Sequence, residues 1–511
     1  MPAVCPRDFC FYKNMKFQKP DLAFHPGISI ISQSRDRGIS LPWTQAALLH
    51  LLLVLGVLWI GLTVNTAMVN TLLIFVFLTG SGLWLCHRTK EILADPNLKI
   101  LGTFWLVKVG MTLFLLYAGW IPYLDPATSP AWGYDPQRYF QNAMELIKNG
   151  WKPAVSQNYQ GILYYYAGIF YLFGYNPVIP ALINAYVTLL GTLFLIRCAY
   201  SFAPERTTKD WLLVGLLLIP EVLWYDVMTS RETLMAVLII VATLSVGRYL
   251  VGVGKTRLTI TLLLCGITLL AILAVRTSMA IPVVVNIAIM AYMLRSRRQM
   301  GPVFKVLLIV LGLGAILVGP FIQQVTGGYD IDYLEKLESV RSFEPSEGQE
   351  WSDRSIGLYL APNNAWQALL YLPPRMVLYL ATPLPNVTVS IAELLDGSWS
   401  AWQRLMTLPT SIMMLLGFHY VLAATVQAWR YRLRSPASLV LPVTFWCTFI
   451  AVAGGNIIIH ERYRLMLTLI LFTCMWWGYT RCSRREVKLC AMVWFGLLAC
   501  GTLFYMGYKF I

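Results

Sequence analysis

The chain has 511 residues and a formal net charge of +15, with 57% hydrophobic and only 13% charged residues. Its mean hydropathy is +0.61. Because a soluble chain carries about a quarter charged residues, this composition argues against a cytosolic enzyme, a secreted disulfide module and a nucleic-acid partner, and it predicts an all-α polytopic membrane protein.

Long apolar runs predict about thirteen transmembrane helices. Runs of about 17 to 25 residues are long enough to cross a bilayer, and in chain order they are 43–63, 66–86, 100–118, 177–197, 210–227, 233–251, 258–275, 279–294, 303–322, 404–428, 437–455, 463–480 and 488–508. Two further apolar runs differ from these: 161–174 is too short to cross, and 366–384 is interrupted by Pro373, Pro374 and Arg375. We interpret both as interfacial or re-entrant segments.

Basic residues predict the side of the membrane on which each loop lies. With the N-terminus inside, the cytoplasmic segments hold 26 of the 40 Lys and Arg residues but only 8 of the 25 acidic residues, as the positive-inside rule requires. These segments are 1–42, 87–99, 197–210, 248–257, 295–305, 430–434 and 481–488. The chain then divides into a cytoplasmic tail (1–42), a transmembrane region (43–322) containing a first outer loop (119–160), a large outer loop with the re-entrant segment (323–403), and a C-terminal transmembrane region (404–511).

The first outer loop carries a candidate catalytic acid. Apolar residues recur at helical spacing after Asp135, which predicts an amphipathic helix over 136–149 with Asp135 as its N-cap. Capping alone would account for this aspartate. Its place on the outer rim, beside Arg138 and Tyr139 and ahead of an aromatic stretch, favours a role in a site. Aromatic faces stack on sugar rings, although they also form ordinary interfacial belts.

Ionisable residues gather at the outer ends of several predicted spans. They are Glu221, Asp226, Arg231, Glu232, Arg276, Arg375, His460, Glu461, Arg462 and Arg464. Such residues are costly in lipid and are functional candidates by default. Snorkelling to the headgroups would explain any one arginine, but their convergence from separate segments, with carboxylates between them, favours a site. Arginines hold phosphate or diphosphate groups through forked, charge-assisted hydrogen bonds.

The order of these features resembles the GT-C superfamily of integral membrane glycosyltransferases, which includes protein mannosyltransferases, aminoarabinose transferases and bacterial surface-polysaccharide enzymes. The resemblance covers about residues 100–480 and rests on three motifs: YDPQRYFQNAMELIKNGW around Asp135, PEVLWYDVMTSRETLMA at 220–236, and ERYRLML at 461–467. It implies a GT-C-like fold and a polyprenyl-phosphate or polyprenyl-diphosphate sugar donor. It also implies a glycan, lipid or protein acceptor and a site facing outward from a bacterial inner (plasma) membrane.

Transfer from such a donor needs a base for the acceptor hydroxyl and cations for the departing phosphate. Asp135 is the candidate base. The candidate donor-phosphate residues are Arg231, Arg276, Arg462 and Arg464, with Arg375 as a secondary one. Glu232 and Glu461 are expected to orient these arginines, Arg138 and Tyr139 to support the base, and His460 to shuttle protons or contact the acceptor.

The sequence indicates no cofactor with certainty. A divalent metal is compatible with this chemistry but is not indicated, because Pro136 stands where many similar enzymes carry a second acidic residue.

Two other functions stay open. An O-antigen or exopolysaccharide polymerase or ligase handles the same lipid carriers, and its key loop would be 323–403, with Asp135 dispensable. A polytopic transporter or lipid-glycan flippase would instead place ionisable residues and broken helices at mid-membrane in repeated halves. Lys108, Glu221 and Asp226 are the residues nearest to that pattern.

Overall fold

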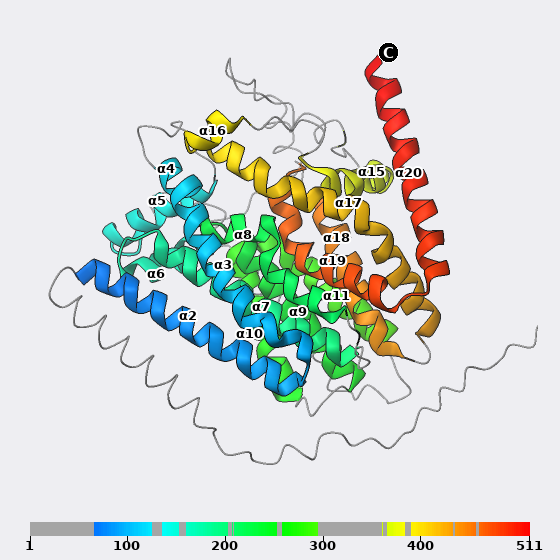
Figure 1. Cartoon of the computed structure of the whole chain (residues 1–511), viewed down its shortest axis with the longest axis horizontal. Coiled ribbons are helices and arrows are strands. Elements are labelled where there is room, and N and C mark those ends of the chain that lie inside the picture. Colours follow the sequence, from blue (N-terminus) through cyan, green and yellow to red (C-terminus); the bar gives the residue numbers. More distant parts are fainter. Residues whose placement is uncertain are drawn as a thin grey trace, which may run out of the picture. The chain divides into compact units, whose positions relative to one another are not determined.

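The computed structural model describes residues 66–124, 135–152, 160–202, 207, 209–252, 258–294, 360, 365–383, 390–432, 435–455 and 459–510. All regular secondary structure among these residues is helical (Figure 1). The chain divides into two units, Met1–Leu52 and Leu53–Ile511, and every described residue belongs to the second. The predicted all-α class is therefore confirmed.

Helices of the N-terminal half precede residue 295. They are α2 (Thr66–Leu93), η1 (Pro96–Ile100), α3 (Leu101–Leu115), η2 (Leu116–Trp120), α4 (Ile121–Leu124), α5 (Asp135–Lys148), α6 (Gln160–Phe173), α7 (Val178–Phe202), η3 (Asp210–Leu218), α8 (Pro220–Val227), α9 (Glu232–Val251), α10 (Leu258–Arg276), η4 (Thr277–Met279) and α11 (Ala280–Met293). Local signals set several of the ends. Pro220 occupies the first turn of α8, where a missing N–H costs nothing, and Gly252 ends α9 with a left-handed φ of 71°.

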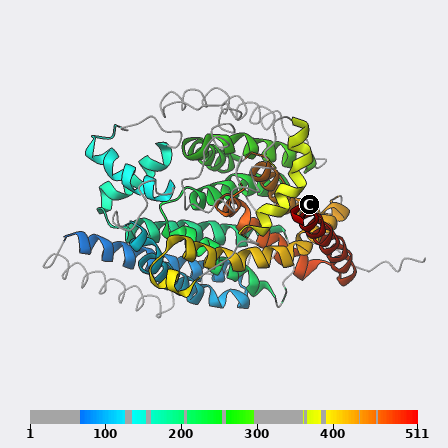
Figure 2. The ribbon, with the colours of Figure 1, turned by 90° about the horizontal axis from the view of Figure 1, so that it is seen from above.

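Helices of the C-terminal half follow residue 364. They are α15 (Ala365–Ala381), α16 (Ile391–Leu395), α17 (Trp399–Tyr431), η5 (Pro436–Leu439), α18 (Val440–Gly455), α19 (Glu461–Arg481) and α20 (Arg484–Phe510). α19 packs against α9, α17 and α18 in the interior. α20 lies at the edge of this unit in both views and exposes most of its apolar side chains (Figures 1 and 2).

Eight helical segments in the described part of the chain are long and apolar enough to cross a membrane, so the protein is an integral multi-pass membrane protein. They are α2, the run from η1 to α4, α7, α9, α10, α17, the run from η5 into α18, and α20. The described residues do not show the predicted count of thirteen. Five predicted spans are not among the eight. The spans 43–63 and 303–322 lie outside the described residues, 279–294 forms the shorter helix α11, 210–227 divides between η3 and α8, and 463–480 lies in α19.

The apolar run 366–384, which we interpret as interfacial or re-entrant, is helical over most of its length. Pro373 and Pro374 lie inside α15, and Arg375 in the same helix is buried. Proline has a helical φ, but inside a helix it removes one hydrogen bond and its ring crowds the carbonyl four residues earlier, so both positions are costly. The interpretation of 366–384 as an interfacial or re-entrant segment stays a prediction, whereas the start of the following span, placed at 404, moves to Trp399.

Close helix contacts depend on particular glycines. A Cβ at Gly161 of α6 would lie 2.0 Å from the carbonyl oxygen of Ala274 in α10, and one at Gly478 of α19 would lie 1.9 Å from that of Tyr420 in α17. Small residues allow helices in membranes to approach this closely. Gly161 thereby allows α6 to lie close to the last turn of α10, which carries Arg276.

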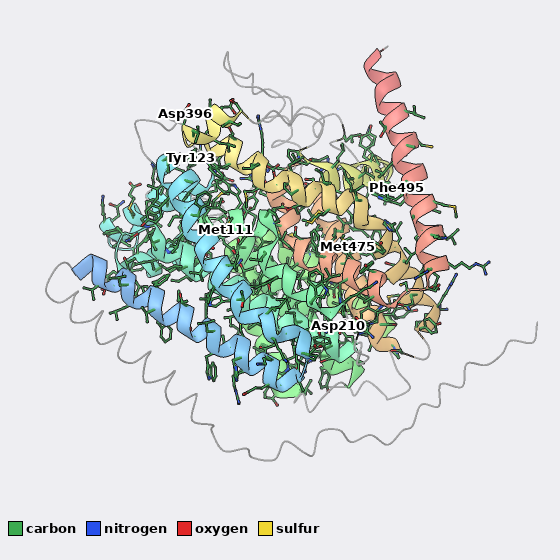
Figure 3. The ribbon with its side chains drawn as sticks, in the orientation of Figure 1. Met111, Tyr123, Asp210, Asp396, Met475 and Phe495 are labelled. Carbon is green, nitrogen blue, oxygen red and sulfur yellow. The ribbon has the colours of Figure 1, made fainter. Side chains whose placement is uncertain are left out.

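Residues from predicted outer segments and from a predicted inner segment lie toward opposite ends of the helices. Tyr123 and Asp396, both from predicted outer segments, lie toward one end, and Asp210 from a predicted inner segment lies toward the other (Figure 3). The ring of Tyr123 also stacks on that of Trp399, with centroids 5.3 Å apart. Which end faces the cytoplasm stays a prediction.

Candidate active site

Asp135 and Arg462 form an ion pair across 327 residues of sequence. Arg462 Nη1 donates to Asp135 Oδ2 at 2.7 Å. Asp135 lies in the first turn of α5, close to its predicted place as N-cap, and Arg462 lies in the first turn of α19. The Asp135 side chain remains 27% exposed while it is paired.

Two further arginines lie beside this pair. The guanidinium carbon of Arg276 lies 4.8 Å from the centroid of the Tyr463 ring, and that of Arg462 lies 4.7 Å from the same centroid. Arg231 precedes α9, and its Nε lies 3.5 Å from Glu232 Oε1. Arg231 and Arg276 are close enough for their charges to act on each other. We call Arg231, Arg276 and Arg462 the outer arginine cluster.

Helix ends add to the positive potential at this cluster. The first turns of α5, α9 and α19 meet here, since they carry Asp135, Glu232 and Arg462. The N-terminus of a helix carries about half a positive charge on its unpaired N–H groups, and such ends favour anions. The guanidinium groups and the backbone therefore favour an anion here, and the carboxylates of Asp135 and Glu232 offset part of that effect.

The charge state of Asp135 follows from these neighbours. Burial raises the pKa of the carboxyl, but the positive charges of Arg462, Arg231 and Arg138 outweigh that effect and hold the pKa below its ordinary value of 3.8. Asp135 is thus ionised at neutral pH. Tyr139, one turn further along α5, is buried, which raises the pKa of its hydroxyl and keeps it neutral.

A short loop between α8 and α9 positions Arg231 relative to Asp135. Asn184 Nδ2 donates to the carbonyl oxygen of Met228 at 2.9 Å, and Tyr166 Oη donates to that of Ser230 at 2.7 Å. Thr229 Oγ1 donates to the carbonyl oxygen of Pro136, the residue next to Asp135. The loop that carries Arg231 is therefore fixed to the first turn of α5.

Arg464 and Arg375 are held by other parts of the protein. Arg464 is fully buried, pairs with Glu221, and donates to carbonyl oxygens of α15 and α17. Arg375 Nε donates to the carbonyl oxygen of Ala453 at 2.7 Å, and its Nη1 donates to that of Leu360 at 3.1 Å. Neither arginine has a described contact with the outer arginine cluster.

The supporting residues fall into two groups. His460 caps α19, because its Nδ1 accepts from the backbone N–H of Arg462 at 3.3 Å, and Glu461 is hydrogen-bonded by Gln403. Glu461 Oε2 lies 3.2 Å from His460 Nδ1. Arg138 is exposed on α5 and acts on Asp135 only through its charge.

Within the described ranges, no group of three or more His, Cys, Asp and Glu side chains has a metal-binding arrangement.

Two residues at this site were not predicted from the sequence. Tyr463 stands inside the quoted ERYR motif, where its position between two arginines was the available signal. Thr229 gave no signal at all, because its role depends on the fold bringing two distant turns together.

The fold and its charged interior define a multi-pass helical membrane protein. No protein-family model, curated protein sequence or solved structure matches this chain.

Proposed function

We propose that this protein is a membrane glycosyltransferase of the GT-C type. It moves a sugar from a polyprenyl-phosphate or polyprenyl-diphosphate carrier to a glycan, lipid or protein acceptor on the outer face of the membrane, in cell-surface polysaccharide or glycoconjugate synthesis. The observation that carries the proposal is the ionised, partly exposed Asp135 paired with Arg462 beside Arg231 and Arg276.

The chemistry needs both charges of this arrangement. Asp135 takes the proton of the acceptor hydroxyl, and the acceptor oxygen forms a bond to the anomeric carbon of the donor sugar. The bond between that carbon and the phosphate oxygen breaks, and its electron pair leaves on the phosphate. The outer arginine cluster stabilises this gain of negative charge, which is largest in the transition state.

Asp135→Asn is the sharpest test. Asparagine is nearly isosteric and keeps an oxygen that accepts from Arg462, but it cannot take a proton. With full-length protein in nanodiscs, a panel of polyprenyl-phosphate sugars and a glycan acceptor, release of free polyprenyl phosphate should fall by roughly two to four orders of magnitude. Asp396→Asn is the matched control, because Asp396 is exposed near the end of the helices that Tyr123 marks (Figure 3). Near-normal release by Asp135→Asn would remove the base from the proposal.

A specific observation favours the transporter or flippase alternative. Two ion pairs, Lys108 with Asp226 and Arg464 with Glu221, are fully buried among membrane helices, and such residues often mark transport paths. Movement of a lipid-linked sugar across liposomes without chemical change would support that alternative.

The polymerase or ligase alternative depends on 323–403, much of which lies outside the described residues. Full activity of Asp135→Asn with elongated products would favour it.

A further inference from the structure

The ring of Tyr463 lies against two guanidinium groups, those of Arg276 and Arg462. The guanidinium carbons of Arg276 and Arg462 lie 4.8 Å and 4.7 Å from the centroid of this ring. Both distances are inside the roughly 6 Å range of cation–π attraction. Two cations brought close together repel each other. The negative face of an aromatic ring offsets part of that repulsion, so the ring helps to hold both guanidinium groups at one place.

The hydroxyl of Tyr463 is oriented by the same arginine. Arg462 Nη2 donates to it at 2.7 Å, which uses the oxygen as an acceptor. A phenolic hydroxyl is both donor and acceptor, and among the described residues this hydroxyl has no hydrogen-bond partner other than Arg462. Its own hydrogen is therefore available at the outer arginine cluster, next to the groups that attract an anion.

We propose that Tyr463 is a phosphate-contacting residue, whose hydroxyl donates to an oxygen of the lipid phosphate while its ring keeps Arg276 and Arg462 on the same anion. The inference rests on the proposed function, since it takes the lipid phosphate as the ligand of the cluster. It adds a hydroxyl donor beside the guanidinium groups, whose positive charges outweigh the effect of burial and hold the pKa of this hydroxyl below its ordinary value of 10. A phosphate oxygen would then be bound by Tyr463 and Arg462 together, through two neighbouring hydrogen bonds.

The test separates the hydroxyl from the ring. Affinity for farnesyl phosphate, a short polyprenyl phosphate, is measured by titration calorimetry on the full-length protein in nanodiscs. Tyr463→Phe keeps the ring and should weaken binding by about 10- to 100-fold, the value of one hydrogen bond to a charged group. Tyr463→Leu removes the ring as well and should weaken binding further. Tyr479→Phe, on the same helix near Lys209 rather than the cluster, should leave affinity unchanged.

The outcomes distinguish the two proposals. If the unaltered protein does not bind farnesyl phosphate, the proposed donor site fails, and the Tyr463 inference fails with it. If it binds and Tyr463→Phe binds equally well, only the Tyr463 inference is overturned. A parallel titration with inorganic phosphate should show the same loss in Tyr463→Phe; a loss confined to the farnesyl ester would also overturn the phosphate contact. Unchanged melting temperature of Tyr463→Phe shows that the fold is intact, so the result stands even if Tyr463→Leu misfolds.

Discussion

Removing Arg464 should destabilise the protein rather than weaken donor binding selectively. Arg464 Nε lies 3.0 Å from both carboxylate oxygens of Glu221, and neither side chain is exposed. The remaining guanidinium nitrogens donate to carbonyl oxygens of Tyr379, Leu380, Thr382 and Thr407. One side chain therefore joins α19 to α8, α15 and α17.

The magnitude follows from what Arg464→Leu leaves behind. Breaking a buried ion pair by removing one partner costs about 3–5 kcal/mol, because the other charge stays buried without compensation. Replacing both charges removes that penalty, so Arg464→Leu combined with Glu221→Leu should recover much of the loss. The carbonyl oxygens of α15 and α17 lose their donor in both variants, so recovery should be incomplete.

Thermal unfolding in detergent, followed by tryptophan fluorescence, measures this difference. Arg464→Leu should unfold several degrees lower than the unaltered protein, and the double variant should lie between them. Farnesyl phosphate affinity of the fraction that remains folded should be nearly unchanged. If Arg464→Leu instead kept its melting temperature and lost farnesyl phosphate affinity, Arg464 would be a ligand-binding residue, as predicted from the sequence, and not a residue that stabilises the fold.

Three further outcomes follow from contacts at or near the site. Lys108→Met leaves Asp226 buried without its cation and should destabilise by about 3–5 kcal/mol; adding Asp226→Leu should restore the melting temperature, and no restoration would contradict the pairing. Thr229→Val removes the hydrogen bond to Pro136, worth about 0.5–1.5 kcal/mol, so turnover should fall several-fold while Thr229→Ser retains it; equal turnover in both variants would exclude a positioning role. The depressed pKa of Asp135 means that its ion pair stabilises the fold at neutral pH, and that this stabilisation is lost only as pH falls through the folded pKa, below 3.8. Turnover should therefore show no acid limb from Asp135 near neutrality, and a limb there that Asp135→Asn abolishes would contradict the charge environment.

Local periodicity and composition predicted the individual elements well. The pattern after Asp135 predicted a helix over 136–149, and α5 spans Asp135–Lys148 with Tyr139, Ala143 and Leu146 buried. The spans of α9 and α10 were predicted within one residue at each end. These features depend on neighbours in sequence, which is why the pattern alone was sufficient.

Partners in space could not be predicted in the same way. Arg462 and Arg464 are two residues apart and carry the same charge, so the sequence assigned both to the donor phosphate. The structure pairs one with Asp135 and the other with Glu221, from helices more than 200 residues away. Pro373 and Pro374 are the opposite case: both are strong local helix breakers, yet both lie inside α15, which packs against α17 and α18.

The spacing of these two arginines also sets the rotation of α19 about its own axis. Residues two positions apart project about 200° apart around an α-helix, so Arg462 and Arg464 point in nearly opposite directions. Turning α19 by half a revolution would direct Arg464 toward Asp135 and Arg462 toward Glu221, each displaced by about 3 Å along the helix axis, so neither ion pair would form as it does. The two ion pairs, on opposite faces of α19, therefore allow only one rotation of this helix about its axis. A one-residue insertion early in α19 should consequently damage the interior and the outer arginine cluster at the same time.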